Sequence, residues 1–393
     1  MSINYFLLFR ILDRKKHLCI RNTRNLPHFY SNFCYNRKND VNIFNFLKKG
    51  MLNVKQHAEN EILQPTLLCD KKGNLNPAAI GYARKPLIQS NLTGHLMRKK
   101  KWNYWGVYGD EIFFSATISH LDYAAICFVY FLEYETQRYY EKTMTIPLGG
   151  RVKMPTQVLE TIKFTSSEMA IEFTYLQNET HLVVTIPNFD GDALHADLVI
   201  SHPPTDETLN VVIPWNRKTF QFTGKHHTLP TSGLVTIGDR SFSFTPEESF
   251  AVLDYGRGVW PRKATWNWGM ASQRVRGRRI GLNLGGKWTD GTGMTENAVF
   301  VDGKMTKIHE DVLFDYNKED YMQPWHVKSK FSHQVALKFS PFFERVTTAN
   351  VTLIKSEVHQ MFGYYDGHVL LDNGETLVIQ QMLGSIEEHI AKW

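Results

Sequence analysis

Two acidic residues, Asp290 and Glu296, lie in a stretch rich in tryptophan that runs from Trp266 to Gly303. A carboxyl group among apolar side chains is disfavoured as an ion, so its pKa rises and it can donate a proton near neutral pH. Proton donation to a carbon–carbon double bond starts hydration, isomerisation or cyclisation of an alkene. The stretch therefore predicts Asp290 and Glu296 as catalytic acids.

Both carboxylates also have a structural interpretation. Asp290 precedes Gly291, which is typical of a turn. Pairing with Arg257 or Lys287 would instead hold a carboxylate in its ionised form. Asp254 also lies near tryptophans and has the same two interpretations. At this level the choice between a proton donor and a structural carboxylate stays open.

Large aromatic side chains supply the apolar surroundings that such an acid requires. An aromatic surface with a few polar groups is typical of a pocket for a mostly apolar ligand. Large aromatic residues also fill ordinary β cores, so a purely structural role is the alternative. The residues predicted to line the pocket are Trp102, Tyr104, Trp260, Trp266, Trp268 and Trp288.

Four polar residues in the same region are predicted to orient a polar end of the ligand. Alternate residues of a strand face opposite sides, so Trp266 and Trp268 share one face and Asn267 lies on the other. If the tryptophans face inward, Asn267 faces outward or into a neighbouring element. The four predicted residues are Asn267, Asn283, Lys287 and Asn297.

Other chemistries find little support in the sequence. The residues from Gly281 to Lys287 match the spacing of a phosphate-binding loop, but Trp288 stands where a serine or threonine is needed. The residues that follow cannot start the helix that such a loop requires, so we expect these glycines to serve close strand packing. The sequence contains no H-E-x-x-H, C-x-x-C or G-x-S-x-G pattern. We therefore expect neither a metal nor a cofactor.

The charge distribution argues against nucleic acid as a partner. The chain has 393 residues and a formal net charge of +6. Of its 45 lysines and arginines, ten lie in residues 1–50, against two of the 39 acidic residues. The remainder is close to neutral, so the basic balance belongs to a basic extension and not to a binding face.

The cysteines and the hydropathy pattern predict a cytoplasmic protein. Four cysteines are too few for a disulfide framework, and Cys127 lies in an apolar run as a buried thiol does. Reduced cysteines fit a cytoplasm. No run approaches the ~18 apolar residues of a membrane helix, so we expect no integral membrane segment.

The order of residues predicts an all-β fold. From Trp102 onward, runs of β-branched and aromatic residues alternate with turns roughly every ten residues, which is typical of antiparallel sandwiches and barrels. Asp302-Gly303 and Asn373-Gly374 are strong hairpin signals. The last nine residues, SIEEHIAKW, predict a short terminal helix.

Several long motifs in the same order resemble a family of domains of unknown function, the 2804 family. The resemblance covers about residues 61 to 390. It implies a tandem lipocalin-like (calycin-type) architecture, distantly similar to carotenoid hydratases of the hydroxyneurosporene synthase type and to tocopherol cyclases. Those proteins act on polyene or prenyl lipids by proton chemistry. The motifs are RKPLIQSNLTGHLMRKKKWNYW, FSATISHLDYA, DYGRGVWPRKATWNWGMAS and GLNLGGKWTDGTGMTENAVFVDGK.

We therefore predict two tandem lipocalin-like antiparallel barrels or sandwiches with little helix, at residues 51–245 and 246–393. We expect the basic extension at 1–50 to be disordered or not part of the native protein. The predicted function is binding of a hydrophobic isoprenoid or acyl ligand in an aromatic-lined pocket, with or without acid-catalysed hydration or isomerisation. The alternatives are a noncatalytic structural or interaction module and, third, a sugar-binding β domain.

Overall fold

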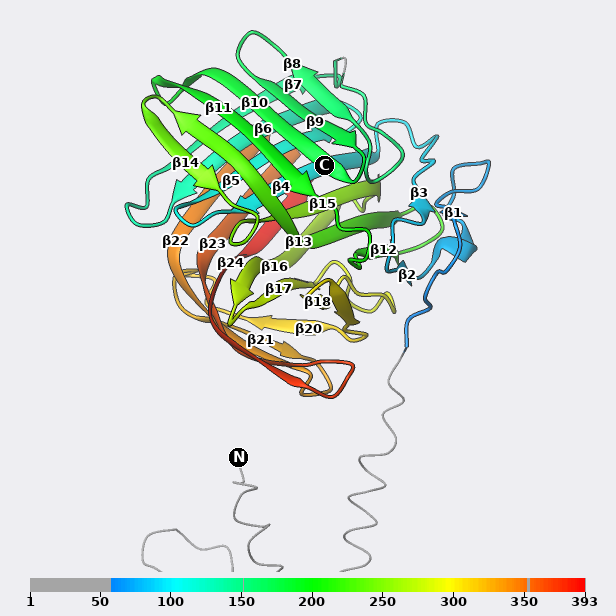
Figure 1. The fold of residues 1–393 in the computed structure, drawn as a ribbon. Helices are drawn as coiled ribbons and strands as arrows, with labels where there is room; N and C mark the ends of the chain where they lie inside the picture. Colours follow the sequence, from blue (N-terminus) through cyan, green and yellow to red (C-terminus); the bar gives the residue numbers. More distant parts are fainter. Residues whose placement is uncertain (1–57, 151, 352–353, 393) are drawn as a thin grey trace, which may run out of the picture. The chain divides into compact units, whose positions relative to one another are not determined.

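The computed structural model describes residues 58–150, 152–351 and 354–392, so the predicted extension at 1–50 lies outside the described residues. Residues from Gln56 onward form one compact unit. The described residues form 24 strands and one short 3₁₀ helix, η1 (Pro77–Ala79), and contain no α-helix. The predicted all-β fold is confirmed: two curled antiparallel sheets make up the unit (Figure 1).

The first sheet contains 13 strands. Its main path runs β7-β6-β5-β4-β15-β13-β11-β10-β9-β8, while β12 and β14 pair with β13, and β2 pairs with β12. The strands are β2 (Tyr82–Ala83), β4 (Lys99–Tyr108), β5 (Ile112–His120), β6 (Ala124–Glu133), β7 (Tyr139–Pro147), β8 (Ile162–Thr165), β9 (Ala170–Leu176), β10 (Glu179–Phe189), β11 (Asp192–Ser201), β12 (Leu209–Pro214), β13 (Phe220–Ile237), β14 (Arg240–Phe244) and β15 (Phe250–Val259). A separate parallel pair consists of β1 (Thr66–Leu67) and β3 (Ile88–Gln89).

The second sheet contains nine strands in the order β19-β18-β17-β16-β24-β23-β22-β21-β20. Three of them, β22 to β24, are 17 residues long and lie side by side (Figure 1). The strands are β16 (Lys263–Val275), β17 (Arg278–Gly286), β18 (Ala298–Val301), β19 (Lys304–Lys307), β20 (Val312–Asp315), β21 (Trp325–Ser329), β22 (Val335–Val351), β23 (Ile354–Leu370) and β24 (Thr376–Lys392).

The sequence changes from one sheet to the other between Val259 and Lys263. β15 therefore belongs to the first sheet, although the predicted domain division lies before it, near residue 245. The division into domains at 51–245 and 246–393 stays a prediction, because the described residues pack as one unit.

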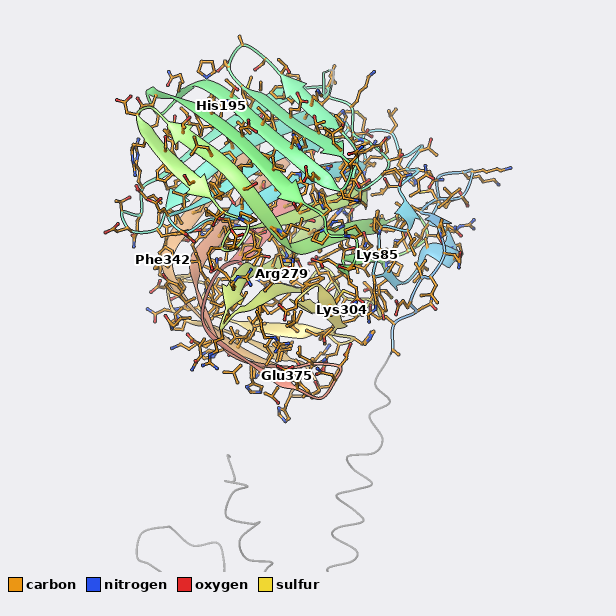
Figure 2. All side chains as sticks on the ribbon, viewed as in Figure 1. Lys85, His195, Arg279, Lys304, Phe342 and Glu375 are labelled. Carbon is orange, nitrogen blue, oxygen red and sulfur yellow. The ribbon has the colours of Figure 1, made fainter. Side chains whose placement is uncertain are left out.

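Ionic contacts and apolar clusters join the two sheets. Arg279 on β17 pairs with Asp206 of the first sheet's loops at 3.0 Å, and lies where the two sheets meet (Figure 2). Buried side chains of β4 to β6 also pack against β16, β23 and β24. Two facing layers thus enclose an interior between them, and that interior is where the site described below lies.

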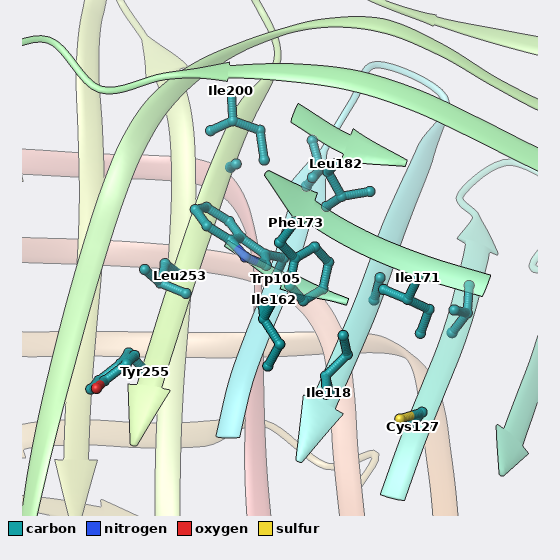
Figure 3. Packing of buried hydrophobic residues seen from close by; sticks show 14 of the residues in the cluster. Trp105, Ile118, Cys127, Ile162, Ile171, Phe173, Leu182, Ile200, Leu253 and Tyr255 are labelled. Carbon is teal, nitrogen blue, oxygen red and sulfur yellow. The ribbon is translucent and has the colours of Figure 1, made fainter. Parts of the chain in front are cut away.

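Alternate side chains on the strands of the first sheet point inward and fill its core. On β11 the side chains of Leu194, Leu198 and Ile200 are buried, whereas His195 between them is exposed. Together with Trp105 and other apolar residues they form the main core (Figure 3). A second apolar core lies inside the second sheet.

The predicted terminal helix is wrong, because residues 385–392 belong to β24. Its end pairs with both β16 and β23, from Gly384 to Lys392. Hydrogen bonding on two sides outweighs the local helix preference of glutamate and alanine. The consequence for function is that Glu387 and Glu388 lie on opposite faces of a sheet instead of on a solvated helix.

Removal of β24 is expected to unfold the protein. A chain ending at residue 375 loses the strand between β16 and β23 and leaves both edges and the core unpaired. We expect loss of the cooperative thermal transition, measured by circular dichroism, while a chain lacking residues 1–50 keeps it. A truncated protein that melts like the full chain would disprove the central place of β24.

Candidate functional site

Five tryptophan side chains meet where the two sheets face each other. Trp260, in the turn between β15 and β16, lies at the centre and is 3% exposed. Its ring centroid is 5.3 Å from that of Trp266, 5.1 Å from that of Trp288 and 6.0 Å from that of Trp102. Trp215 lies 4.9 Å from Trp260 and was not singled out by the sequence. The rings form one continuous aromatic cluster.

Tyr104 and Trp268 extend this aromatic surface further between the sheets. Their rings meet edge to face at 5.8 Å. Trp266 packs against both this pair and the Trp260 group. The six aromatic residues predicted as pocket lining therefore share one surface, which we call the inter-sheet surface. Their contact with a ligand stays a prediction.

Three residues of the inter-sheet surface are only half-buried: Trp102, Tyr104 and Trp266. A glycine makes room for one of them, since a Cβ on Gly256 would lie 2.0 Å from the Trp102 ring. Any other residue at Gly256 would displace the indole. The sequence thus keeps part of the aromatic surface accessible while the rest is packed.

A buried ion cluster lies beside the aromatic rings. Lys225 Nζ lies 2.9 Å from Asp254 Oδ1 and 3.1 Å from Glu296 Oε2. The same ammonium group lies 4.3 Å from the centroid of the Trp268 ring. Trp288 Nε1 donates a hydrogen bond to Glu296 Oε1 at 2.7 Å. One lysine is therefore shared by two carboxyl groups.

The electrostatics of this cluster favour an ionised lysine. Burial alone lowers the pKa of Lys225, but the carboxylates of Asp254 and Glu296 outweigh it and raise that pKa. Burial raises the pKa of Glu296, although Lys225 opposes the shift. A Cβ on Gly285 would lie 2.0 Å from Glu296 Oε1, so this glycine leaves the space that the carboxyl fills. Gly281 and Gly285 are both closely packed, as we expect for the glycines between Gly281 and Lys287.

Glu387 on β24 is a second buried carboxyl group on the inter-sheet surface. It lies directly across from Trp268 on β16 and from Gln360 on β23. Trp266 Nε1 donates a hydrogen bond to Glu387 Oε1 at 3.2 Å. Burial raises the pKa of Glu387 to about 7, although Arg345 and the indole favour the ionised form. Near neutral pH this carboxyl can therefore hold and release a proton.

The raised pKa of Glu387 should make the free energy of unfolding depend on pH. The folded protein keeps this proton up to about pH 7, whereas an unfolded chain loses it near 4.5. Between these values the folded state binds more protons, so the free energy of unfolding falls as pH rises from about 4.5 to about 7. We expect a fall of about 3 kcal/mol that Glu387→Gln lacks. Urea unfolding of both proteins across this range measures it, and parallel curves would contradict the shift.

A buried arginine closes the inter-sheet surface on the side of β7 and β22. Arg345 Nη2 lies 2.7 Å from Glu141 Oε2, and its guanidinium carbon lies 4.3 Å from the centroid of the Tyr130 ring. Tyr130 OH donates to Gln360 Oε1 at 3.0 Å and lies 2.9 Å from Tyr104 OH. A line of polar groups thus runs from Glu141 to the aromatic surface.

A solvent-open hollow of about 410 Å³ lies at the outer end of this line. It is formed by β7 and β22, and Glu141 belongs to both its wall and the ion pair with Arg345. Glu141 therefore joins the wall of the hollow to the line of polar groups. Its lining residues are Tyr139, Tyr140, Glu141, Thr143, Val346, Thr347 and Thr348.

Two of the four predicted polar residues, Asn283 and Asn297, form buried hydrogen bonds next to the inter-sheet surface. Asn283 Oδ1 accepts a hydrogen bond from Trp268 Nε1 at 2.9 Å, and Asn283 Nδ2 donates to the Glu296 carbonyl at 2.6 Å. Asn297 Oδ1 accepts from the Gly285 N–H at 2.7 Å. Both asparagines are fully buried and use these groups to join β17 to the neighbouring loop.

The other two polar residues lie on the opposite face of the second sheet. Asn267 Nδ2 donates to Tyr316 OH at 3.2 Å, as the strand alternation predicts. Lys287 pairs with Glu388. Burial alone raises the pKa of Glu388, but hydrogen bonds from Lys287, Tyr316 and Tyr321 outweigh it and lower the pKa to about 2. This second cluster is separate from the inter-sheet surface.

Asp290 lies outside the inter-sheet surface as well. It is exposed in the turn after β17, where its Oδ1 accepts a hydrogen bond from the Lys287 N–H at 2.9 Å. Gly291 follows with a φ of +73°, which a turn requires. Of the two predicted acids, only Glu296 is buried among the tryptophans.

The sequence did not single out Lys225, Arg345 or Glu387 as site residues. Lys225 lies next to the paired histidines and Glu387 lies in the segment predicted as a helix. A useful signal would have been the alternation in residues 376–392, because strand assignment separates Glu387 from Glu388. The pairing across strands far apart in sequence has no local signature.

No group of three or more histidine, cysteine, aspartate or glutamate side chains in the described part of the chain is arranged to hold a metal ion. Within the same residues, no helix is long and apolar enough to cross a membrane. The two described cysteines, Cys69 and Cys127, are buried free thiols.

Comparison with known proteins identifies the family that the sequence resembled. The profile of a family described as a domain of unknown function, DUF2804, matches residues 59–393. No curated protein matches the sequence.

Several solved structures have a similar fold. Kievitone hydratase from Nectria haematococca aligns with a TM-score of 0.48 and 11% identity, over 74% of this chain and 88% of that one. CghA with Sch210972 aligns with a TM-score of 0.47 and 10% identity, over 75% and 88%. A putative AttH from Nitrosomonas europaea aligns with a TM-score of 0.45 and 10% identity, over 74% and 92%.

Proposed function

Because this chain belongs to the DUF2804 family, whose description assigns no activity, we propose its function from the inter-sheet surface itself. The protein binds a hydrophobic, alkene-bearing small molecule on this surface and donates a proton to it from Glu387. One observation carries the proposal: a carboxyl group is held by the Trp266 indole among large aromatic rings, three of which stay half-buried.

The chemistry follows from this arrangement. Transfer of the Glu387 proton to one alkene carbon breaks the π bond and leaves a carbocation on the other carbon. The half-buried rings of Trp266 and Tyr104 stabilise such a cation electrostatically. Addition of water and loss of its proton gives a hydrated product, while loss of a neighbouring proton gives an isomer. In each case the released proton restores the carboxyl group of Glu387.

We assign Glu296 a supporting place in this reaction. Its carboxylate pairs with Lys225 and accepts a hydrogen bond from Trp288. It also fills the space that the missing side chain of Gly285 leaves. It positions Lys225, whose charge favours the ionised form of Glu387. Asp290 has no part in the proposal, since it is exposed in a turn.

The proposal is tested with lipid extract of the protein's own host incubated with the full chain in deuterium oxide. Proton donation to carbon places deuterium in the product whether the outcome is hydration, isomerisation or cyclisation. Mass spectrometry should find products with a carbon-bound deuterium in the presence of the protein and none without it. An extract that contains no labelled product, in repeated preparations, rejects the enzymatic proposal.

The dense packing of Trp260 and Trp288 favours one second candidate, a noncatalytic structural module. Both rings are at least 92% buried and stack on each other at 5.1 Å. In this case Trp266→Leu would lower stability and would leave no ligand uptake to lose. Under the first proposal the same variant releases a hydrophobic probe such as a retinoid or a fatty acid, measured by fluorescence.

A further inference from the structure

Three large apolar side chains are exposed on two turns of the first sheet. Leu96 is 84% exposed, Leu148 75% and Met97 45%. Met97 and Leu148 have φ values of +61° and +57°, which residues other than glycine rarely adopt. Apolar residues held outward in such turns gain nothing from the core, so they indicate contact with something outside the chain.

Hydrogen bonds place these turns together. The Arg98 N–H donates to Asp122 Oδ2 at 3.1 Å, which joins the turn at 94–98 to the turn at 121–123. The Leu148 N–H donates to the Tyr123 carbonyl at 2.8 Å, which joins the turn at 148–150 to the same point. The three turns therefore form one surface, which we call the turn surface.

The turn surface adjoins the aromatic site. Arg98 Nη2 donates to the Trp260 carbonyl at 2.8 Å, and Trp260 is the centre of the tryptophan cluster. Lys263, the first residue of β16, follows Trp260 by three positions.

Basic side chains border the turn surface. Lys263, Lys392 and Lys355 lie directly opposite one another on three adjacent strands and are exposed. Like charges placed opposite each other destabilise a sheet. None of the three forms an ion pair with a described residue, and the nearest acidic neighbour along β23 is Glu357. Further exposed basic residues occur in adjoining turns: Lys71, Lys72, Lys218 and Arg262.

We propose that the turn surface docks the protein on an anionic lipid bilayer, with Leu96, Met97 and Leu148 inserted among the lipids and the lysines on the headgroups. Apolar tips bordered by basic residues match the two layers of such a membrane surface, since lysine is attracted by anionic headgroups and leucine by the acyl region. A nucleic acid fits less well, because phosphate recognition has no use for exposed leucine.

The test is sedimentation of the full chain with vesicles of phosphatidylcholine alone or mixed with phosphatidylserine. We expect binding to the mixed vesicles and weaker binding to the neutral ones. Leu96→Glu with Leu148→Glu should lower the affinity about tenfold or more. Lys263→Glu with Lys392→Glu should lower it to a similar extent and should weaken its dependence on salt.

Matched controls lie elsewhere on the surface. Leu313 and Leu370 are 39% and 43% exposed, and Lys328 and Lys338 are exposed on β21 and β22. The same substitutions at these positions should leave binding unchanged. Because residues 1–57 are identical in all proteins compared, their charge cancels in the comparison.

Each other outcome overturns the proposal. These outcomes are absence of binding to mixed vesicles, equal losses in controls and test variants, and a leucine pair whose substitution changes nothing. Duplex DNA that competes with vesicles while the leucine variants bind normally would indicate a nucleic-acid surface instead. Vesicle binding requires no turnover, so this result and that of the deuterium experiment are independent.

Discussion

Replacement of Lys225 by methionine is expected to lower the free energy of unfolding by about 3–5 kcal/mol. The variant keeps the volume of the side chain but removes the only cation that, among the described residues, forms an ion pair with Asp254 and Glu296. Two carboxyl groups then remain near the Trp268 ring without their cation, and the ammonium group has also been removed from that ring. Urea unfolding at pH 7 measures the loss.

A matched exposed pair provides the control for Lys225→Met. Lys163 pairs with Glu172 on the surface, where both side chains are more than a third exposed. Lys163→Met should therefore change stability by less than about 1 kcal/mol. The deficit of Lys225→Met should also shrink as acid protonates the two carboxyl groups. A deficit that matches the exposed control would show that the ion cluster has no energetic role.

Replacement of Glu387 by glutamine should abolish turnover while the fold persists. The amide can still accept the Trp266 hydrogen bond, and it resembles the protonated carboxyl that burial favours. It has no acidic proton to give, so the rate of deuterium incorporation should fall by about 10²- to 10⁴-fold. The pH profile of the native protein should fall above about 7, where the acid loses its proton.

Variants of two other carboxylates, Asp290 and Glu388, test whether Glu387 is the acid. Asp290→Asn should keep full activity, because Asp290 is exposed in its turn. Glu388→Gln tests the neighbouring carboxylate on the opposite face of β24, which interacts with Lys287 and Tyr316. Loss of activity in Asp290→Asn together with normal activity in Glu387→Gln would restore the assignment made from the sequence.

The fold and the aromatic surface were accessible from the sequence because both depend on local patterns. Strand alternation placed Trp266 and Trp268 on one face and Asn267 on the other, and this is how they lie. Turn residues such as Asp302-Gly303 marked hairpins that the structure contains between β18 and β19. Large aromatic residues pack well in β folds, and their gathering between the two sheets agrees with the aromatic-rich stretch of the sequence.

The ionic part of the site was not accessible because it depends on contacts between distant strands. Lys225 and Glu296 lie 71 positions apart, and Arg345 pairs with Glu141 from another sheet. Glu387 was missed because its segment resembles a helix locally and becomes a strand through pairing on both sides. Asp290 is predicted from its aromatic neighbours along the chain; it lies in a turn outside the inter-sheet surface, and its role as an acid stays a prediction.

The most direct test of the central claim is native mass spectrometry of the full chain purified from its own host, followed by identification of the bound lipids. We predict a stoichiometric apolar molecule with at least one double bond on the native protein. It should be absent from a Trp102→Leu, Trp266→Leu variant that still unfolds cooperatively. A ligand-free native protein that also fails to take up retinoid, carotenoid and fatty-acyl probes would contradict the claim, as would a ligand that the variant retains.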